Sequence, residues 1–256
     1  MALGLGIGIA QLVGVVREAR GLEQRREAIA IAGPGARALA TALAAGGEPG
    51  AIAVDGDPVR GAAAVWIIDT TPSAADVAAL RRAAREGVPR LAVLKGAGLV
   101  TVPYVFPQDV IEWVDDASLA ERLARLLATV LDDGDAVALA GRLPLLRPHV
   151  QRRLIWRASI LNAAIGAAPW MKEAHLPLMS LAQARMLLAL GIARGDTLPR
   201  DPQGLAVATG PALAGAVGTG VGLRALYRRL PRRGPLAAAG VAFAGTRALG
   251  ELRARI

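Results

Sequence analysis

Three residues near the start of the chain have the types that a phosphate-binding loop uses. Gly33, Gly35 and Arg37 directly follow a short apolar run, Ala28–Ala32. Glycines before a helix let backbone N–H groups approach an anion. A working loop also needs a lysine for the β- and γ-phosphates and a serine or threonine for magnesium. Neither directly follows Gly35, so we do not expect hydrolysis of a nucleoside triphosphate.

Two further residues, Asp69 and Lys95, stand at strand ends, at places that resemble those of the Asp-x-x-Gly and Asn-Lys-x-Asp signatures of small GTPases. Asp69 closes the apolar run 63–69, but the next residues, Thr70, Thr71 and Pro72, omit the glycine of an Asp-x-x-Gly turn. Lys95 follows the apolar run 91–94, without the asparagine and aspartate that read guanine. Two interpretations stay open. These five residues form an altered nucleotide site, or they are ordinary turn and strand-end residues.

The elements that position these residues alternate between two patterns. Short apolar runs predict buried strands, and the segments between them have helical periodicity, which is typical of a mostly parallel sheet covered on both faces. Ser73 and Asp76 have the spacing of a capping box. The predicted strands are 28–32, 51–54, 63–69, 91–94 and 100–106, and the predicted helices are 36–45, 73–86 and 118–131.

From residue 134 onward the pattern changes to helices alone, with prolines between them, as is usual at helix boundaries. The candidates are 136–143, 149–168, 178–194, 203–230 and 236–255. The sequence therefore predicts an N-terminal apolar helix and hinge over 1–26, an α/β domain over 27–133 and an all-α domain over 134–256.

Charge is divided unevenly along the chain. Residues 1–149 carry 15 Lys and Arg against 17 Asp and Glu, whereas residues 150–256 carry 15 against 4. Gly204–Leu223 is uncharged over 20 residues, the length of a membrane span, and an arginine cluster follows it. The cluster would attract anionic lipid, and it consists of Arg224, Arg228, Arg229, Arg232 and Arg233.

How these helices meet a membrane stays open from the sequence. They could span the bilayer, lie in its interface or avoid it. The N-terminal apolar run 3–16 is shorter than a span and lacks the features of a secretory signal. Spanning is the leading expectation of the three, so a transmembrane helix is predicted, together with a place on the cytoplasmic side of the membrane.

Three polar residues interrupt the apolar helices of the C-terminal part. We expect Asn162 and Gln183 to form hydrogen bonds between helices, and Arg185 to reach water or a headgroup phosphate. The chain has no Cys and only two His residues, which lie 26 positions apart. We therefore expect neither a metal site nor a cofactor.

Two family resemblances follow from these motifs. Residues 27–132 resemble a small GTPase whose nucleotide signatures have been lost, which implies a degenerate P-loop GTPase-like scaffold. The segments 177–186, 192–195 and 244–250 resemble the YcjF-like family, a domain of unknown function in bacterial membrane-associated proteins. One departure is Arg194, where an aromatic residue commonly precedes the glycine. This second resemblance implies a helical architecture and a membrane location, without a reaction.

Together these patterns predict a non-enzymatic, membrane-associated scaffold or accessory protein with an inactive GTPase-like domain. Its expected partners are anionic lipid and a protein, which could be a second copy of the chain. Two alternatives remain, a nucleotide-binding switch with a non-standard phosphate loop and a soluble homo-oligomer. Nucleic acid is not expected, because no aromatic residues interleave with the arginines and no nucleic-acid-binding motif is present.

Overall fold

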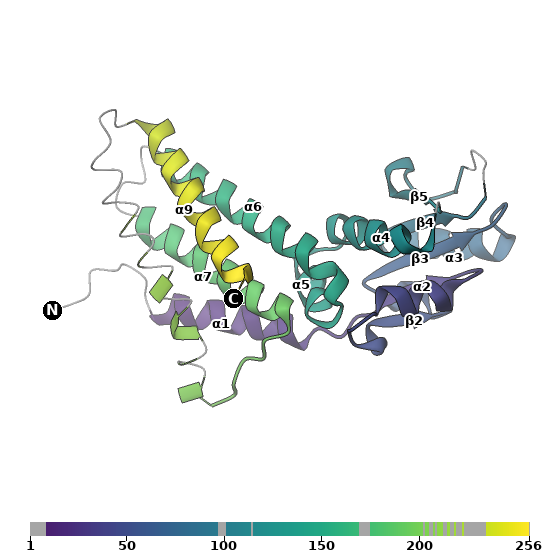
Figure 1. The fold of residues 1–256 in the computed structure, drawn as a ribbon, viewed down its shortest axis with the longest axis horizontal. Helices are drawn as coiled ribbons and strands as arrows, with labels where there is room; N and C mark the ends of the chain where they lie inside the picture. Colours follow the sequence, from purple (N-terminus) through teal and green to yellow (C-terminus); the bar gives the residue numbers. More distant parts are fainter. Residues whose placement is uncertain are drawn as a thin grey trace. The chain divides into compact units, whose positions relative to one another are not determined.

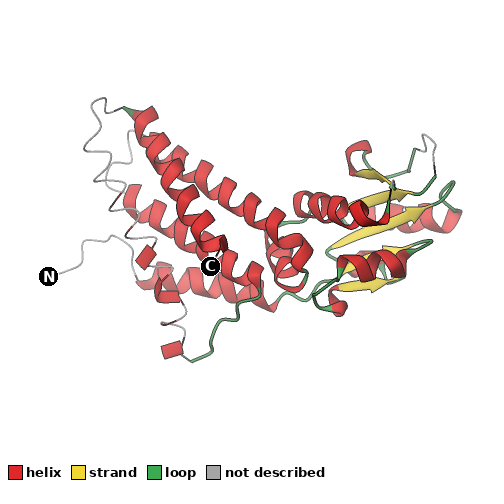
Figure 2. Ribbon diagram, viewed as in Figure 1, coloured by secondary structure: helices red, strands yellow, loops and turns green. Residues whose placement is uncertain are grey.

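The computed structural model describes residues 9–96, 101–113, 115–168, 175–201 and 234–255, with scattered positions between 203 and 222. The chain divides into an α/β unit, Arg25–Val150, and a helical unit that combines Met1–Gln24 with Gln151–Ile256. Figures 1 and 2 show strands in the first unit and helices alone in the second. These boundaries differ from the predicted ones, because the N-terminal helix packs with the C-terminal helices and the first helix after residue 132 packs with the sheet unit.

The α/β unit is built on a five-stranded sheet in the order β2-β1-β3-β4-β5, and every neighbouring pair is parallel. The predicted α/β class with a parallel sheet, followed by a helical region, is confirmed. Its elements are β1 (Ile29–Ala32), α2 (Ala36–Leu43), η1 (Pro49–Ala51), β2 (Ile52–Val54), η2 (Pro58–Arg60), β3 (Ala63–Ile68), α3 (Ala74–Arg85), β4 (Arg90–Leu94), η3 (Pro107–Asp109), β5 (Val110–Glu112), α4 (Asp116–Val130), α5 (Asp133–Arg142) and η4 (Pro144–Leu146).

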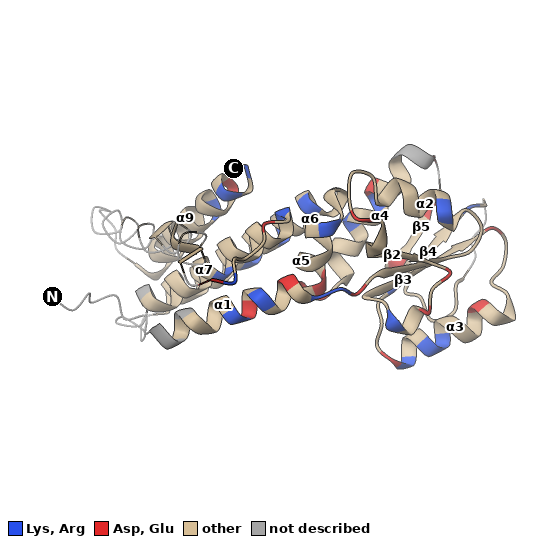
Figure 3. Cartoon of the chain, turned by 90° about the horizontal axis from the view of Figure 1, so that it is seen from below, with Lys and Arg blue, Asp and Glu red and all other residues tan. Residues whose placement is uncertain are grey.

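The sheet buries both faces, as a parallel sheet requires. All six residues of β3 are buried, and successive side chains point to opposite faces. On one face Trp66 packs with Leu80 of α3 in a single apolar cluster. On the other face α2 contacts β1 and β2, and α4 packs against α2 on the side of the sheet opposite α3 (Figure 3). The sheet is therefore the middle layer of the unit.

Local capping fixes where the helices of this unit begin. The expected capping box at Ser73 and Asp76 is present at the start of α3. Asp115 accepts a hydrogen bond from the Ser118 backbone N–H at the start of α4, and Asp132 accepts one from the Asp135 N–H at the start of α5. Each cap satisfies a backbone donor that has no partner inside its helix.

The strand predicted at 100–106 is wrong. Of that range the structure describes 101–106, where it has no strand, and the fifth strand is β5 at Val110–Glu112. Val102 fills the apolar cluster on the α3 face, and Tyr104 has a left-handed φ of 65° that no regular strand adopts. The apolar run thus reflects a packed loop, which prolines at 103 and 107 keep from pairing.

The helical unit is described through four helices. Its elements are α1 (Ile9–Gln24), α6 (Arg147–Ala167), α7 (His175–Arg194) and α9 (Pro235–Arg255). Close contacts join the α6 position Gly166 to Ala238 and Ile155 to Gly250, so α6 runs antiparallel to α9. A Cβ on Gly250 would lie 2.7 Å from the Ile155 Cγ1 atom, so this crossing depends on a glycine.

Candidate functional site

The carboxyl edge of the sheet is the first place to look for a ligand site. The chain leaves β1 toward β2 on one side and leaves β3 toward β4 on the other. Doubly wound sheets bind ligands where neighbouring connections diverge in this way, beyond the carboxyl ends of the strands. In this protein that point lies at Gly33, directly after β1, and Asp69, directly after β3.

Gly33 and Gly35 have a structural reason to be glycine. Their φ angles are 103° and 86°, in the left-handed region that other residues rarely adopt. A Cβ on Gly33 would overlap the carbonyl oxygen of Ile67 in β3. The Gly33 carbonyl accepts a hydrogen bond of 3.1 Å from the Ala36 N–H, and Gly35 forms the N-cap of α2. These glycines turn the chain tightly against β3.

The side chain of Trp113 lies against this edge. Trp113 follows β5, and its backbone N–H donates to the Leu94 carbonyl at 2.7 Å. The Lys95 Nζ lies 5.2 Å from the centroid of the indole ring. A Cβ on Gly35 would be 3.4 Å from the Cη2 atom of the same ring. The structure therefore brings Gly35 and Lys95 together around an aromatic side chain of the protein itself.

The other two predicted nucleotide residues, Arg37 and Asp69, do not join Gly35 and Lys95 in an enclosed site. Arg37 lies on an exposed position of α2, and its carbonyl accepts the Thr41 hydroxyl at 2.9 Å. Asp69 is also exposed, and its carbonyl oxygen restricts Gly96 to a residue without a Cβ. The Lys95 ammonium is placed for a cation–π contact with Trp113. The edge thus has the tight turns that follow the strands of a doubly wound sheet, with the Trp113 indole beside Gly35 and Lys95.

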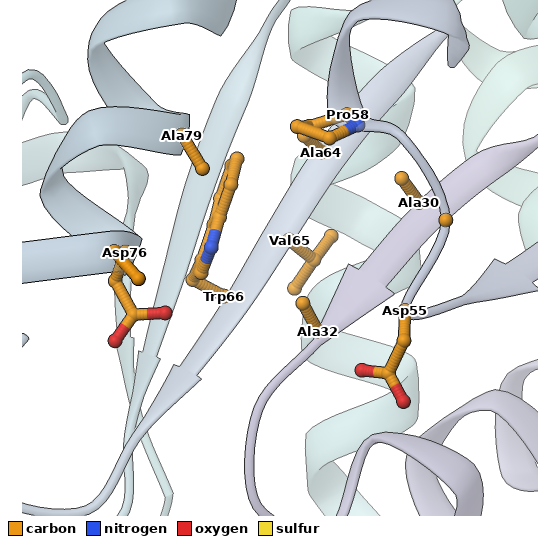
Figure 4. Close-up of a pocket in the computed structure, with 11 residues that line it drawn as sticks. Ala30, Ala32, Asp55, Pro58, Ala64, Val65, Trp66, Asp76 and Ala79 are labelled. Atoms are coloured by element: carbon orange, nitrogen blue, oxygen red, sulfur yellow. The ribbon is translucent and has the colours of Figure 1, made fainter. Parts of the chain in front are cut away.

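A hollow of about 240 Å³ opens on the α3 face of the sheet. Figure 4 shows Trp66 and Pro58 beside it, and the carboxylates of Asp55 and Asp76 toward the lower part of the view. Its volume is below the roughly 300 Å³ at which small-molecule pockets begin. Asp76 is already engaged, because its Oδ2 accepts from the Ser73 N–H at 2.9 Å and the Ser73 hydroxyl at 2.6 Å. None of the five predicted nucleotide residues lines this hollow.

Within the helical unit, three buried polar side chains meet. Asn162 of α6 donates from Nδ2 to the Thr246 Oγ1 of α9 at 2.8 Å, and Gln183 of α7 donates from Nε2 to the same oxygen at 3.0 Å. All three are fully buried. Among the residues that the structure describes, the Asn162 Oδ1 and Gln183 Oε1 atoms find no hydrogen-bond partner. This polar cluster fixes α6, α7 and α9 in one register, because any sliding would leave buried amide donors unpaired.

Arg185 points away from that cluster. Its Nε donates to the Glu18 Oε2 of α1 at 2.9 Å, and both side chains are about half exposed. Two residues further along α1, Arg20 donates to the Pro199 carbonyl at 3.1 Å. These contacts place α1 alongside α7 and parallel to it. Because water screens this exposed ion pair, it adds little stability. Together with the Arg20 contact, it establishes the relative direction of α1 and α7.

The helices of this unit carry their charges toward the same end. Figure 3 shows the coloured positions of α1 and α9 toward their C-terminal ends. Since α1, α7 and α9 run parallel and α6 runs against them, the uncharged segments lie together. We call them the uncharged end, and they are 9–16 of α1, 158–167 of α6, 176–184 of α7 and 235–246 of α9.

The expectation of a transmembrane helix is wrong for the described chain. Among the residues that the structure describes, no helix combines the length and the apolar character needed to cross a bilayer. Most of the uncharged stretch Gly204–Leu223 lies outside the described residues. The same holds for every member of the predicted arginine cluster, namely Arg224, Arg228, Arg229, Arg232 and Arg233.

Sequence reasoning missed two residues that the structure makes central. Trp113 stood outside every motif, and only the pairing of β4 with β5 brings it to the carboxyl edge. Thr246 lies in a helix made mostly of Ala, Gly and Leu, and a hydroxyl in such a helix is the signal that could have identified it. In the described parts of the chain, no group of His, Asp or Glu side chains is arranged to hold a metal ion.

No family model, curated protein or solved structure matches this chain. The resemblances to small GTPases and to the YcjF-like family therefore stay predictions that rest on the quoted residues. The strand order is one of the common orders of doubly wound sheets, so it supports the α/β class alone.

Proposed function

We propose that this chain is a non-enzymatic accessory protein that binds the surface of a membrane through its helical unit. The observation that carries this proposal is the uncharged end, in which four helices lack a charged residue over 8 to 12 positions each. Large apolar side chains stay exposed there, including Val13 of α1 and Ile160 of α6. Burial of such side chains in lipid would be favourable by about 25 cal/mol per Å² of apolar surface.

The charge of the unit adds to this attraction. Residues 150–256 have an excess of 11 positive charges, and each Arg near an anionic surface contributes about 1 kcal/mol. Anionic lipids make the cytoplasmic leaflet negative, so we place the contact on the cytoplasmic side. Because salt screens these charges over about 10 Å, binding should weaken as ionic strength rises.

In this proposal the α/β unit is a GTPase-like scaffold that recruits a protein partner and does not turn over nucleotide. Two observations support it. Trp113 lies over the carboxyl edge, and an exposed loop presents Tyr104 and Phe106, which are 46% and 60% exposed. Arg90 holds that loop, because its Nε donates to the Tyr104 carbonyl at 2.8 Å. Aromatic side chains in a fixed loop suit a protein contact.

Flotation of the full chain with vesicles tests the membrane contact. The vesicles are made of phosphatidylcholine alone or of phosphatidylcholine mixed with phosphatidylglycerol. We expect the protein to float with the anionic vesicles at low salt and to bind less at high salt. Failure to float with anionic vesicles at low salt would contradict the proposal. A detergent-free oligomer that ignores lipid would identify the apolar helices as a subunit interface instead.

Calorimetry with GTP, ATP and their diphosphates tests the second part of the proposal. We expect no heat of binding and no release of phosphate, because the loop after β1 lacks the Lys and Ser or Thr of a working site and Trp113 lies against Gly35. Binding of any of these nucleotides at micromolar affinity would favour the nucleotide switch.

A further inference from the structure

One side of the helical unit presents apolar side chains from two neighbouring helices. Trp156 and Ile160 of α6 are about half exposed, and the Trp156 ring meets Phe243 of α9 edge to face with 5.4 Å between ring centroids. Positions four residues apart on a helix share a face. The exposed apolar positions on this side, together with the half-buried Phe243, form what we call the α6/α9 face: Trp156, Ile160, Ala164, Leu236, Gly240 and Phe243.

The two helices expose these residues in the same direction. Gly166 and Ala242 face each other across the α6/α9 contact, with 3.2 Å between a Cβ on Gly166 and the Ala242 Cβ. Phe243 is one position beyond Ala242, and Trp156 is one beyond Ile155, which faces Gly250. In an antiparallel pair, one step forward on each helix turns both side chains to the same side. The Trp156–Phe243 contact agrees with this geometry.

Arginines border the α6/α9 face. Arg152 lies one turn before Trp156, and Arg247 lies one turn after Phe243, so both continue the same stripes. Arg247 Nε donates to Glu251 Oε1 at 2.7 Å. At the other end of α9, Arg232 and Arg233 precede Gly234 in the sequence, although they lie outside the described residues. The uncharged segment of α9 is therefore flanked by arginines on both sides.

This arrangement determines how the face can meet a bilayer. The uncharged segment of α9 has 12 residues and is about 18 Å long. Insertion of the bundle end-on would need about 20 apolar residues to cross the hydrocarbon core, and the uncharged segment of α9 is too short for that. If the face lies along the bilayer, its apolar side chains enter by about 5–10 Å and the exposed Arg152 and Arg247 stay at the headgroups.

We infer that the α6/α9 face lies in the plane of an anionic membrane surface, with Trp156, Ile160 and Phe243 at the hydrocarbon boundary and Arg152 at the headgroup phosphates. This inference rests on the proposed function and assigns its contact surface. A Trp ring suits that position, because its apolar body enters lipid while its N–H remains at the wet interface.

The helices need not separate to bind in this way. The face already points outward, and the polar cluster of Asn162, Gln183 and Thr246 lies behind it in the interior of the unit. Opening the bundle would expose two amide groups and a hydroxyl to lipid, which is costly for groups without a partner. The bound unit therefore keeps the packing it has in solution.

The test is flotation of the full chain with vesicles of phosphatidylcholine and phosphatidylglycerol, for wild type, Trp156→Gln and Ile160→Gln. Loss of one large apolar anchor should weaken partitioning about tenfold or more. Leu252→Gln is the matched control, because Leu252 is an apolar residue of α9 that is 59% exposed and lies outside the face. It should bind like wild type. Circular dichroism of each variant checks that the helices are retained.

The outcomes separate the two levels of the proposal. If wild type does not float, the membrane function itself fails. If wild type floats and both face variants float equally well, the function stands and the α6/α9 face is overturned. A second readout uses lipids brominated on the acyl chains. These should quench wild-type tryptophan fluorescence, and the quenching should largely disappear in Trp156→Phe; undiminished quenching in that variant would also overturn the face.

Discussion

The two units of this protein differ in how much of a possible binding surface they leave exposed. In the α/β unit, at the edge where a doubly wound sheet would bind a ligand, Gly33 packs tightly against β3 and the Trp113 ring lies beside Gly35 and Lys95. In the helical unit, Trp156 and Ile160 remain exposed, and the charged residues of the four described helices lie toward one end. The carboxyl edge of the sheet has the topology of a ligand site, but it is less open to a ligand than the exposed helices are. The comparison therefore indicates that the binding surface of this protein lies on the helical unit.

The largest expected effect comes from substituting Gly33 at the carboxyl edge of the sheet. Gly33→Ala combines a left-handed φ with an overlap at the Ile67 carbonyl, so the α/β unit should lose about 3 kcal/mol of stability or more. Gly46→Ala is the control, because Gly46 has a φ of 70° and nothing within 4 Å of its Cβ position. It should cost about 1 kcal/mol. Urea unfolding compares them, and equal losses would mean that close contact with β3 has no role.

The next effect concerns the interior of the helical unit. Thr246→Val removes the oxygen that accepts from both Asn162 and Gln183, leaving two buried amide donors unpaired. We expect a loss of about 2 kcal/mol or more in the free energy of unfolding. Ser159→Ala should cost less, because that buried hydroxyl donates to the Ile155 carbonyl of its own helix and so joins no second helix by this bond. Thermal unfolding of both variants measures the difference. If Thr246→Val is as stable as wild type, the polar cluster does not stabilise the helical unit.

Substituting arginines in each unit sharpens the contrast in surface function. Arg152→Gln removes a charge that borders the α6/α9 face and should weaken binding to anionic vesicles about fivefold, the equivalent of about 1 kcal/mol. Arg81→Gln on the exposed side of α3 should leave vesicle binding unchanged. Flotation at low salt compares the two variants. Equal losses would show that the attraction follows total charge rather than the helical surface.

The smallest effect is a titration. Hydrogen bonding from Arg247 lowers the pKa of Glu251 below its usual range. The stability from this pair is therefore present above the ordinary glutamate pKa of about 4.3 and is lost as pH falls through the lowered value. Carboxyl NMR should show a midpoint below that of a free glutamate, and Arg247→Gln should raise it. An unchanged midpoint would mean that the pair does not persist in solution.

The α/β class could be predicted because its strands are short, apolar and separated by helical segments. β3 is the clearest case, since six consecutive buried residues leave no solvent-exposed position. The run at 100–106 is also largely apolar, but its proline, the left-handed Tyr104 and the packing of Val102 distinguish it from a strand. Apolar character predicts burial, and it does not by itself predict backbone pairing.

The candidate surfaces were harder to predict because they depend on directions of packing. The excess of arginine after residue 150 is visible in the sequence. The gathering of uncharged segments requires that α1 run parallel to α7 and that α6 run against α9, and contacts such as Glu18 with Arg185 establish this. The position of Trp113 at the carboxyl edge of the sheet likewise depends on the register between β4 and β5. A transmembrane helix was expected from the composition of Gly204–Leu223 alone, without regard to such packing.

Hydrogen exchange of the full chain, with and without anionic vesicles, tests the difference between the units most directly. Vesicles should slow exchange of peptides from α6 and α9 and leave peptides from the sheet, including β3 and the loop at Gly33, unchanged. Protection confined to the α/β unit, or no protection anywhere in the chain, would contradict the claim that the helical unit is the part that binds the membrane.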